Sequence, residues 1–142
     1  MNWIDRVLMR ILPYFVIENA VRDPFMTRYK VFRCRWFKIF LHHFYRSDED
    51  PELHDHPWNF ISLILWSGYH EVLPSGVRRR RPGHLVHHRA EDAHRVVLSR
   101  PSWSIVITWG PKRTWGFHTK TGWMSYPDFF DRKYGKGQWT TG

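Results

Sequence analysis

Apolar residues near the start of the chain follow a helical period. From Trp3 to Phe15 they recur at steps of three and four residues, with Arg6 and Arg10 on the polar side. Pro13 lies near the end of this pattern and is expected to stop or kink the helix. We therefore predict one amphipathic helix whose apolar face packs on a core, although the same stripe also suits a membrane surface or a partner.

After Asp23-Pro24 the helical period gives way to short segments rich in aromatic and β-branched residues, separated by turns that contain Gly or Pro. The segment from Tyr29 to Phe44 predicts two strands or one long bent strand. The other predicted strands are Trp58 to Trp66, Tyr69 to Leu73, His84 to His88, His94 to Leu98, Ser104 to Trp109 and Trp115 to Lys120. About eight short strands predict an all-β sandwich or barrel with the helix outside it.

The length of 142 residues suits a single domain. We expect residues 1–22 to form the helix that packs on the barrel, residues 23–132 to form the barrel, and residues 133–142 to be a flexible tail. The tail is expected to fray because it contains Gly135, Gly137 and Gly142.

Charge and cysteine content indicate which partners and which cellular compartment to expect. Lys and Arg number 22 against 13 Asp and Glu, giving a net charge of +9 that favours anionic partners. The single cysteine, Cys34, cannot form an internal disulfide, which fits a reducing compartment. No apolar run approaches the roughly 18 residues of a membrane span. We expect a cytoplasmic protein without a transmembrane segment.

A pair of histidines carries the clearest chemical signal. His54 and His56 would point to the same face of a strand and could converge on one ion, with Asp55 pointing the other way. His94, which opens a later predicted strand, is placed to supply a third imidazole. Such a set leaves positions open for water, substrate or dioxygen. A His-x-His pair alone is also compatible with two structural histidines.

The spacing around these histidines resembles the two sequence motifs of the cupin superfamily. In the first motif, His54, His56 and Gly68 match, Ile61 stands at the position of the usual Glu, and Asp48 stands at that of the opening Gly. The second motif is matched by two residues and altered at three. Gly83 and His94 match, whereas Arg89, Glu91 and Leu98 replace the usual Pro, Gly and Asn.

Three further segments, residues 41–50, 53–58 and 115–118, resemble a group of small cupin-like proteins of bacteria and their phages. The resemblance implies an all-β fold of the cupin type, a double-stranded β-helix or jelly-roll barrel, here with one N-terminal amphipathic helix. It also implies a homodimer, because cupins often pair through their sheets.

Because Ile61 removes the usual carboxylate ligand, the resemblance implies a metal site of three histidines, as in the thiol dioxygenases that hold iron. Other cupins without this acid have lost the metal altogether. The expected ion is iron(II), with manganese, nickel or zinc as alternatives. The acids close enough in sequence to replace the missing ligand are Glu52, Glu71, Glu91 and Asp92, and each is expected to be a solvated or salt-bridged surface acid.

Two further residues are candidates for proton transfer. His118 is predicted to lie on a late strand that closes the barrel, and Tyr69 is the tyrosine proposed to steer protons in its place. The other histidines, which are His42, His43, His70, His84, His87 and His88, are assigned structural roles.

Basic residues form a second candidate site. The predicted anion-binding residues are Arg78, Arg79, Arg80 and Arg81 in a connecting loop and Lys112 and Arg113 in a later turn. The alternative is a solvated hairpin that protects a sheet edge. Trp109 and Trp115 beside the later turn could stack on bases. Nucleic-acid binding is nevertheless not favoured, because no RRM, KH or zinc-finger pattern is present.

The leading hypothesis is a metal-binding cupin that acts as a dioxygenase-type enzyme on a small, anionic molecule. A non-catalytic module that binds an anionic metabolite, nucleotide or nucleic acid is the first alternative. Metal-free epimerase chemistry on a sugar nucleotide, with a His and Tyr pair as acid and base, is the second. No nucleophile elbow, P-loop or dinucleotide fingerprint is present, which disfavours serine hydrolases, ordinary NTPases and Rossmann oxidoreductases.

Overall fold

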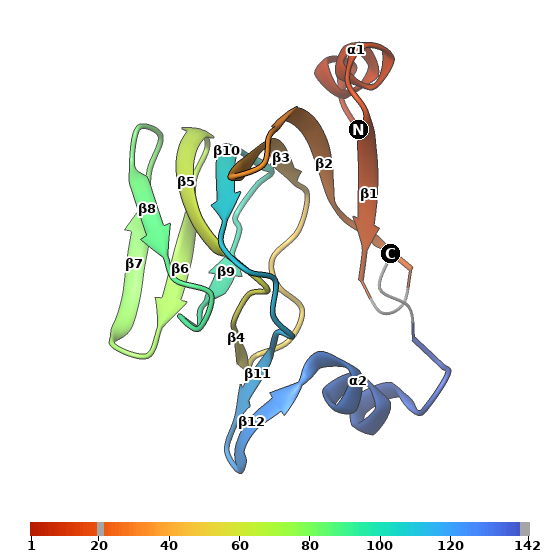
Figure 1. Cartoon of the computed structure of the whole chain (residues 1–142), viewed down its shortest axis with the longest axis vertical. Coiled ribbons are helices and arrows are strands. Elements are labelled where there is room, and N and C mark those ends of the chain that lie inside the picture. The colour runs from red at the N-terminus through yellow and green to blue at the C-terminus, as the bar shows by residue number, and fades with distance from the viewer. Residues whose placement is uncertain (20–21, 140–142) are drawn as a thin grey trace.

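The structure is a computed structural model that describes residues 1–19 and 22–139 (Figure 1). Its elements follow in the order α1 (Trp3–Ile11), β1 (Tyr14–Glu18), β2 (Pro24–Arg33), β3 (Phe37–Phe44), β4 (Leu53–His54), β5 (Asn59–Trp66), β6 (Tyr69–Leu73), β7 (Gly76–Arg80), β8 (Leu85–His88), β9 (Arg95–Val97), β10 (Ser102–Trp109), β11 (Gly116–Thr119), β12 (Gly122–Ser125) and α2 (Tyr126–Tyr134). No helix of the described residues is long and apolar enough to cross a membrane.

The strands form two layers. One layer is a six-stranded antiparallel sheet in the order β1-β2-β3-β10-β5-β8. The other consists of two three-stranded sheets, β12-β11-β4 and β7-β6-β9, which meet where His54 and His94 exchange backbone hydrogen bonds of 2.9 and 3.0 Å. The all-β architecture is therefore confirmed, and the backbone itself brings two of the predicted metal ligands together.

Strict alternation decides which side chains of the six-stranded sheet face inward. In β5, Phe60, Ser62 and Ile64 are buried and the residues between them are more exposed. Ser62 stands opposite Val106 of β10, so the inner face continues across the sheet. This inner face forms one wall of the cavity described below.

The N-terminal segment differs from the expectation in two ways. The helix ends at Ile11 instead of Phe15, because β1 begins at Tyr14, one residue after Pro13. The apolar stripe is not in the core, since Trp3 and Ile11 are 67% and 70% exposed. Asp5, which is 0% exposed, is the buried residue of this helix, so α1 docks through a carboxylate.

The C-terminal segment contains a helix that the sequence analysis missed. Residues 133 and 134, expected to lie in a flexible tail, belong to α2, whose N-cap Ser125 accepts a hydrogen bond from the backbone amide of Asp128. Phe129 of α2 stacks on Phe117 of β11 with ring centroids 4.0 Å apart. Residues 140–142 of the expected tail lie outside the described residues.

The arginine run also lies elsewhere than expected. Arg78, Arg79 and Arg80 belong to β7, the edge strand that pairs with β6, and are not in a loop. A charged edge strand is a common protection against pairing with other chains.

Candidate metal centre

The three predicted ligands converge in the structure. His54 ends β4, His56 follows two residues later, and His94 lies directly before β9. Their ligand nitrogens all lie within 4.8 Å of one another, and the Nε2 atoms of His56 and His94 are 3.1 Å apart. Two nitrogens that bind one ion at about 2.0–2.1 Å are separated by about 2.9–3.4 Å at ordinary coordination angles. The spacing therefore fits a shared metal ion.

Asp55 anchors the His-x-His segment from its other side. This residue is buried, and its carboxylate accepts hydrogen bonds from the backbone amide of Gly116 (2.7 Å) and the indole of Trp123 (2.9 Å). The guanidinium of Arg113 also donates to this carboxylate at 3.4 Å and to the carbonyl of His56 at 3.0 Å. Arg113, predicted to bind anions, therefore holds the segment that carries two of the histidines.

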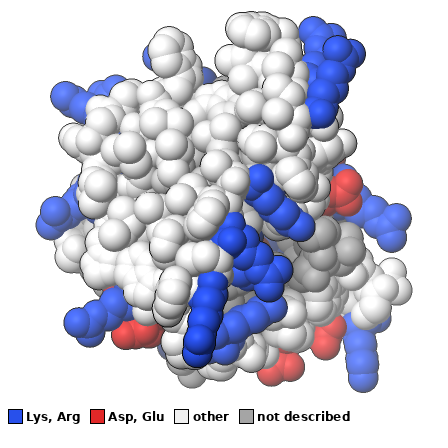
Figure 2. Space-filling view, turned by 45° about the horizontal axis from the view of Figure 1, so that its top comes forward, with Lys and Arg blue, Asp and Glu red and all other residues white. Residues whose placement is uncertain are grey.

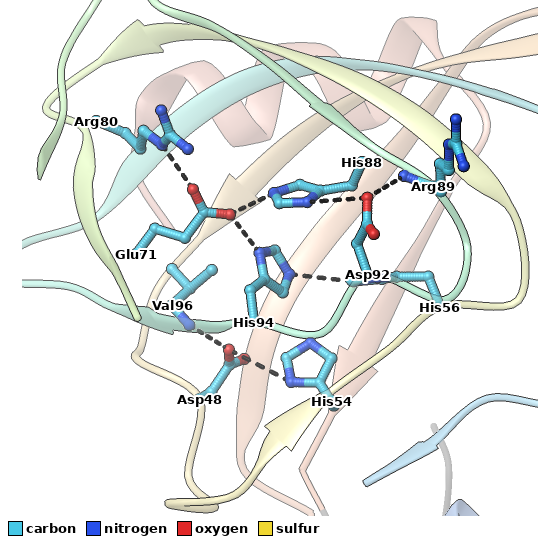
Figure 3. Close-up of polar contacts among 10 residues, drawn as sticks. All are labelled: Asp48, His54, His56, Glu71, Arg80, His88, Arg89, Asp92, His94 and Val96. Atoms are coloured by element: carbon cyan, nitrogen blue, oxygen red, sulfur yellow. Dashed lines mark hydrogen bonds and ion pairs between the residues drawn. The ribbon is translucent and has the colours of Figure 1, made fainter. Parts of the chain in front are cut away.

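Glu71 contacts and orients the third histidine, His94 (Figure 3). It is 0% exposed, and its Oε1 accepts hydrogen bonds from His94 Nδ1 at 2.6 Å and from His88 Nε2. Its Oε2 accepts a hydrogen bond from Arg80 Nε at 2.6 Å. Because His94 donates through Nδ1, its Nε2 keeps a lone pair for an ion, and carboxylate contacts of this kind fix ligand orientation in metal sites.

These contacts correct two expectations. Glu71 is a fully buried acid instead of a surface acid, and Arg80 neutralises it instead of binding external anions. Burial alone would raise the pKa of Glu71, but the hydrogen bonds from His88 and His94 outweigh burial and hold that pKa well below its usual range. The carboxylate is therefore ionised at neutral pH.

A second group that can hold an ion, formed by Glu71, His88 and His94, shares His94 with the first. Its members are closer than two ligands of one ion usually are, since Glu71 Oε1 and His94 Nδ1 are only 2.6 Å apart against about 2.9 Å or more across an ion. The group of His54, His56 and His94 lines a cavity, whereas Glu71 and His88 are not in that lining. The three-histidine group is the better candidate site.

Burial keeps the imidazoles of His54 and His56 neutral at neutral pH. Burial lowers the pKa of His56 well below its usual value, and the charges of His94 and His54 lower it further. Burial also lowers the pKa of His54, although Asp48 beside it acts in the opposite direction. Asp48 Oδ2 lies 3.8 Å from His54 Nδ1 and accepts a hydrogen bond from the Val96 amide at 2.6 Å. Neutral imidazoles are the form that binds metal.

Comparison with known proteins gives no match to a family model or to a curated protein. Solved structures do match. The polyketide cyclase RemF from Streptomyces resistomycificus is 14% identical with a TM-score of 0.64, covering 87% of this chain and 89% of that chain. A cupin 2 conserved barrel domain protein from Rhodopseudomonas palustris is 10% identical with a TM-score of 0.64, covering 79% and 81%. The FeII HppE structure is 12% identical with a TM-score of 0.55, covering 70% and 57%.

The chain has a cupin fold. The motif resemblance of the sequence and the two-layer barrel therefore agree. Ile61, at the usual Glu position of the first cupin motif, belongs to the outward set of β5, and the neighbouring Phe60 faces the histidines. The ring centroids of Phe60 and His56 are 4.7 Å apart. An aromatic ring thus occupies the inner face of this cupin where the sequence lacks the carboxylate.

The histidines open onto a cavity of about 320 Å³ inside the cupin barrel. Most of its lining is apolar, with Phe25, Met26, Phe44, Trp58, Phe60, Val96, Val106 and Trp115 among the lining residues. The polar lining residues include Ser62 and Tyr69. Burial, and the charge of Glu71, raise the pKa of Tyr69 above its usual value, so its phenol stays protonated.

His118 does not share this cavity. It lies on β11 with a side chain that is 46% exposed, and its Nε2 is 3.5 Å from Asp55 Oδ2. The neighbouring residue Phe117 is the buried one. Because alternate residues of a strand face opposite sides, the prediction that His118 transfers protons to a substrate does not fit its position.

Two polar residues of the cavity were missed by the sequence analysis. Arg28 and His42 both line it, from the adjacent strands β2 and β3. Alternation along each strand could have indicated both residues. Arg28 shares a strand face with Met26, and His42 shares one with Phe40 and Phe44, so each polar side chain lies on an apolar face.

The remaining members of the predicted anion-binding set are exposed. These are Arg78, Arg79, Arg81 and Lys112. Figure 2 shows several Lys and Arg side chains gathered near the lower centre of one face of the molecule. Because Arg80 pairs with Glu71 and Arg113 with Asp55, the predicted set does not form one continuous site.

Proposed function

We propose that this cupin binds a divalent metal ion through His54, His56 and His94 and acts as a metal-dependent enzyme on a small molecule. The observation that carries the proposal is the convergence of three imidazoles on one side of an apolar cavity, with His94 oriented by buried Glu71. Iron(II) is the proposed ion, with manganese, nickel or zinc as alternatives.

The proposed reaction is an oxidation of the dioxygenase type. The bound ion would supply open coordination positions and redox chemistry beside the substrate. The chain itself supplies an apolar cavity that limits access of water and holds the substrate against the histidines. Tyr69, which stays protonated and lies in the same lining as the histidines, is proposed to donate a hydrogen bond or proton to the substrate.

The test is the metal content of protein purified without added metal and without a histidine tag. Wild-type protein is expected to contain about one equivalent of metal, and His56→Ala is expected to lose it because two imidazoles bind much more weakly than three. His118→Ala is the matched control, because this histidine lies outside the cavity, and it is expected to keep the metal. Elemental mass spectrometry measures all three proteins.

Equal metal content in wild type and His56→Ala would overturn the ligand assignment. Absence of metal from the wild type, also after reconstitution with iron(II), would overturn the proposed function and favour a non-catalytic binding module. With metal present, consumption of dioxygen in the presence of candidate substrates tests the reaction type, and iron is the ion expected to support it.

A further inference from the structure

Arg28 is a cation in the cavity wall without an acidic partner. It lies on β2, where the register places it between Phe15 of β1 and His42 of β3. Its guanidinium carbon stands over the rings of Phe15 and Phe40 at 5.4 and 5.1 Å. No described carboxylate lies within ion-pair distance of this side chain, in contrast to Arg80, which pairs with Glu71.

The hydrogen bonds of this guanidinium are only partly used. Its Nε donates to Nε2 of His42 at 2.9 Å, and neither terminal nitrogen has a partner among the described residues. Burial removes water from this charge, and no described counterion offsets that loss, so the pKa of Arg28 is lowered to about 10. A fork with two free nitrogens bordering a cavity matches the two oxygens of a carboxylate.

His42 adds a second donor beside the guanidinium. Because its Nε2 accepts the hydrogen bond from Arg28, the ring proton lies on Nδ1. Burial and the neighbouring charge of Arg28 lower the pKa of His42 well below its usual value, so the ring is neutral. Arg28 and neutral His42 offer one positive charge, and Asp48 of the same lining repels anions, so a singly charged carboxylate fits better than a dianionic phosphate.

We infer that Arg28 is the anion-binding residue of the cavity and that the ligand of this site is an apolar carboxylic acid. The carboxylate pairs with Arg28, and the apolar remainder fills the space between Phe60, Val106 and Trp115. The orientation of the bound acid rests on the proposed function, because that function places the end of the acid opposite the carboxylate at His54, His56 and His94. The cavity volume of about 320 Å³ suits a small ligand.

The test compares two probes of nearly the same shape, benzoate and benzamide, by isothermal titration calorimetry. Wild-type protein is expected to bind benzoate more tightly than benzamide. Arg28→Met is expected to bind benzoate at least about tenfold more weakly, because a hydrogen bond to a charged group is lost. Its affinity for benzamide is expected to stay the same. Arg33→Met, which alters an exposed arginine at the end of the same strand, is the control and is expected to match the wild type.

Arg28→Lys provides a second variant that keeps the cation in case the methionine variant does not fold. It is expected to bind benzoate several-fold more weakly than the wild type, because an ammonium lacks the planar fork. Wild-type protein that binds benzoate no better than benzamide would overturn the inference. So would unchanged benzoate binding in both Arg28 variants.

Each titration is carried out with metal-free and with metal-loaded protein, which separates this inference from the proposed function. If the wild type takes up no metal but benzoate binding still depends on Arg28, the metal proposal fails and the anion site stands. If benzoate binding depends on His56 and not on Arg28, the carboxylate binds the metal and the Arg28 inference fails. Metal content of Arg28→Met is expected to equal that of the wild type.

Discussion

Two fully buried carboxylates, Glu71 and Asp5, make nearly the same contacts in different parts of the molecule. Glu71 lies behind the candidate metal centre and accepts hydrogen bonds from two histidines and Arg80. Asp5 lies on α1, at the far end of the barrel from α2 (Figure 1), and accepts hydrogen bonds from Tyr29 and His43. Both acids are therefore buried and accept a hydrogen bond from at least one histidine.

The partners of the two acids show why their roles differ. His94 presents its second nitrogen to a cavity and to His56, so Glu71 controls a group that can bind an ion. His43 stacks on Trp103 with ring centroids 4.0 Å apart, and its second nitrogen is buried without a hydrogen-bond partner among the described residues. Asp5 also closes a capping box with Asn2, so it fastens a helix to the sheet. What distinguishes the candidate site is therefore a second histidine nitrogen that faces a cavity, and not the contact between histidine and carboxylate.

Glu71→Gln is expected to have the largest effect and to separate the two acids. An amide can accept from only one side, so either Arg80 or His94 loses its acceptor, and Arg80 is left without its counterion. Breaking such a buried pair is expected to lower the free energy of unfolding by about 3 kcal/mol or more. Metal affinity is expected to fall by about 10- to 100-fold. Urea denaturation and competition with a chelating dye measure the two effects.

Glu71→Gln with unchanged metal affinity would contradict the role given to Glu71 in orienting His94. The stability measurement is made on metal-free protein as well, because loss of a bound ion lowers stability by itself.

Asp5→Asn is the matched substitution and is expected to have a smaller effect. It weakens the hydrogen bonds from Tyr29 (2.5 Å) and His43 (2.9 Å), and the expected loss of unfolding free energy is about 1–3 kcal/mol. Metal content is expected to stay at the wild-type level, because none of these residues lines the cavity. A loss of metal in this variant would show that the two buried acids are coupled, and it would contradict the assignment of Asp5 to the helix alone and of Glu71 to the candidate metal centre.

The three histidines of the candidate site could be predicted from the sequence, but the acid behind them could not. His54, His56 and His94 follow from the spacing of a strand pair and from the cupin motifs, which are local features of the chain. Glu71 was assigned to the surface because acids are rarely buried alone. Its compensating partners, Arg80 and His88, come from two other strands, and the sequence does not state that pairing. Part of the answer could be predicted, because Tyr69 and Glu71 are two residues apart on one strand and therefore share its inward face.

The helices show a second limit of sequence patterns. Periodicity correctly predicted that the first residues form an amphipathic helix, but the prediction that its apolar face packs on the core was wrong, since Trp3 and Ile11 are exposed. The buried side of the helix contains Asp5, which accepts hydrogen bonds from Tyr29 and His43, whereas Arg6 and Arg10 of the polar side are exposed. The second helix, α2, was missed because residues up to 132 were assigned to the barrel and the glycines after them, such as Gly135, suggested a flexible tail. Proline is nevertheless well suited to a first helical turn, where Pro127 lies, and glycine to a helix terminus, where Gly135 lies.

The pH dependence of stability is expected to give the smallest effect and concerns Asp5 and its partner His43. Burial by itself would raise the pKa of Asp5, but hydrogen bonds from Tyr29, Asn2 and His43 outweigh it and lower the pKa below the ordinary value of 3.8. The unfolded chain therefore binds a proton first as the pH falls. Stabilisation by the ionised Asp5 is complete above pH 3.8 and is lost as the pH falls through the lower pKa of the folded state.

Between the ordinary histidine pKa of 6.5 and pH 3.8, the difference in unfolding free energy between wild type and Asp5→Asn also includes His43, because Asp5 raises the pKa of that imidazole. Below pH 3.8, protonation of Asp5 removes the contribution of its own charge, and the two proteins should converge. Each unit by which the folded pKa lies below the unfolded value contributes about 1.4 kcal/mol to this convergence. Urea midpoints measured from neutral pH downward test it, and Glu71 titrates equally in both proteins, so that it cancels from the difference. Curves that stay parallel below pH 3.8 would show that the charge of Asp5 does not fasten α1, and the helix would then depend on the neutral hydrogen bonds of this cluster.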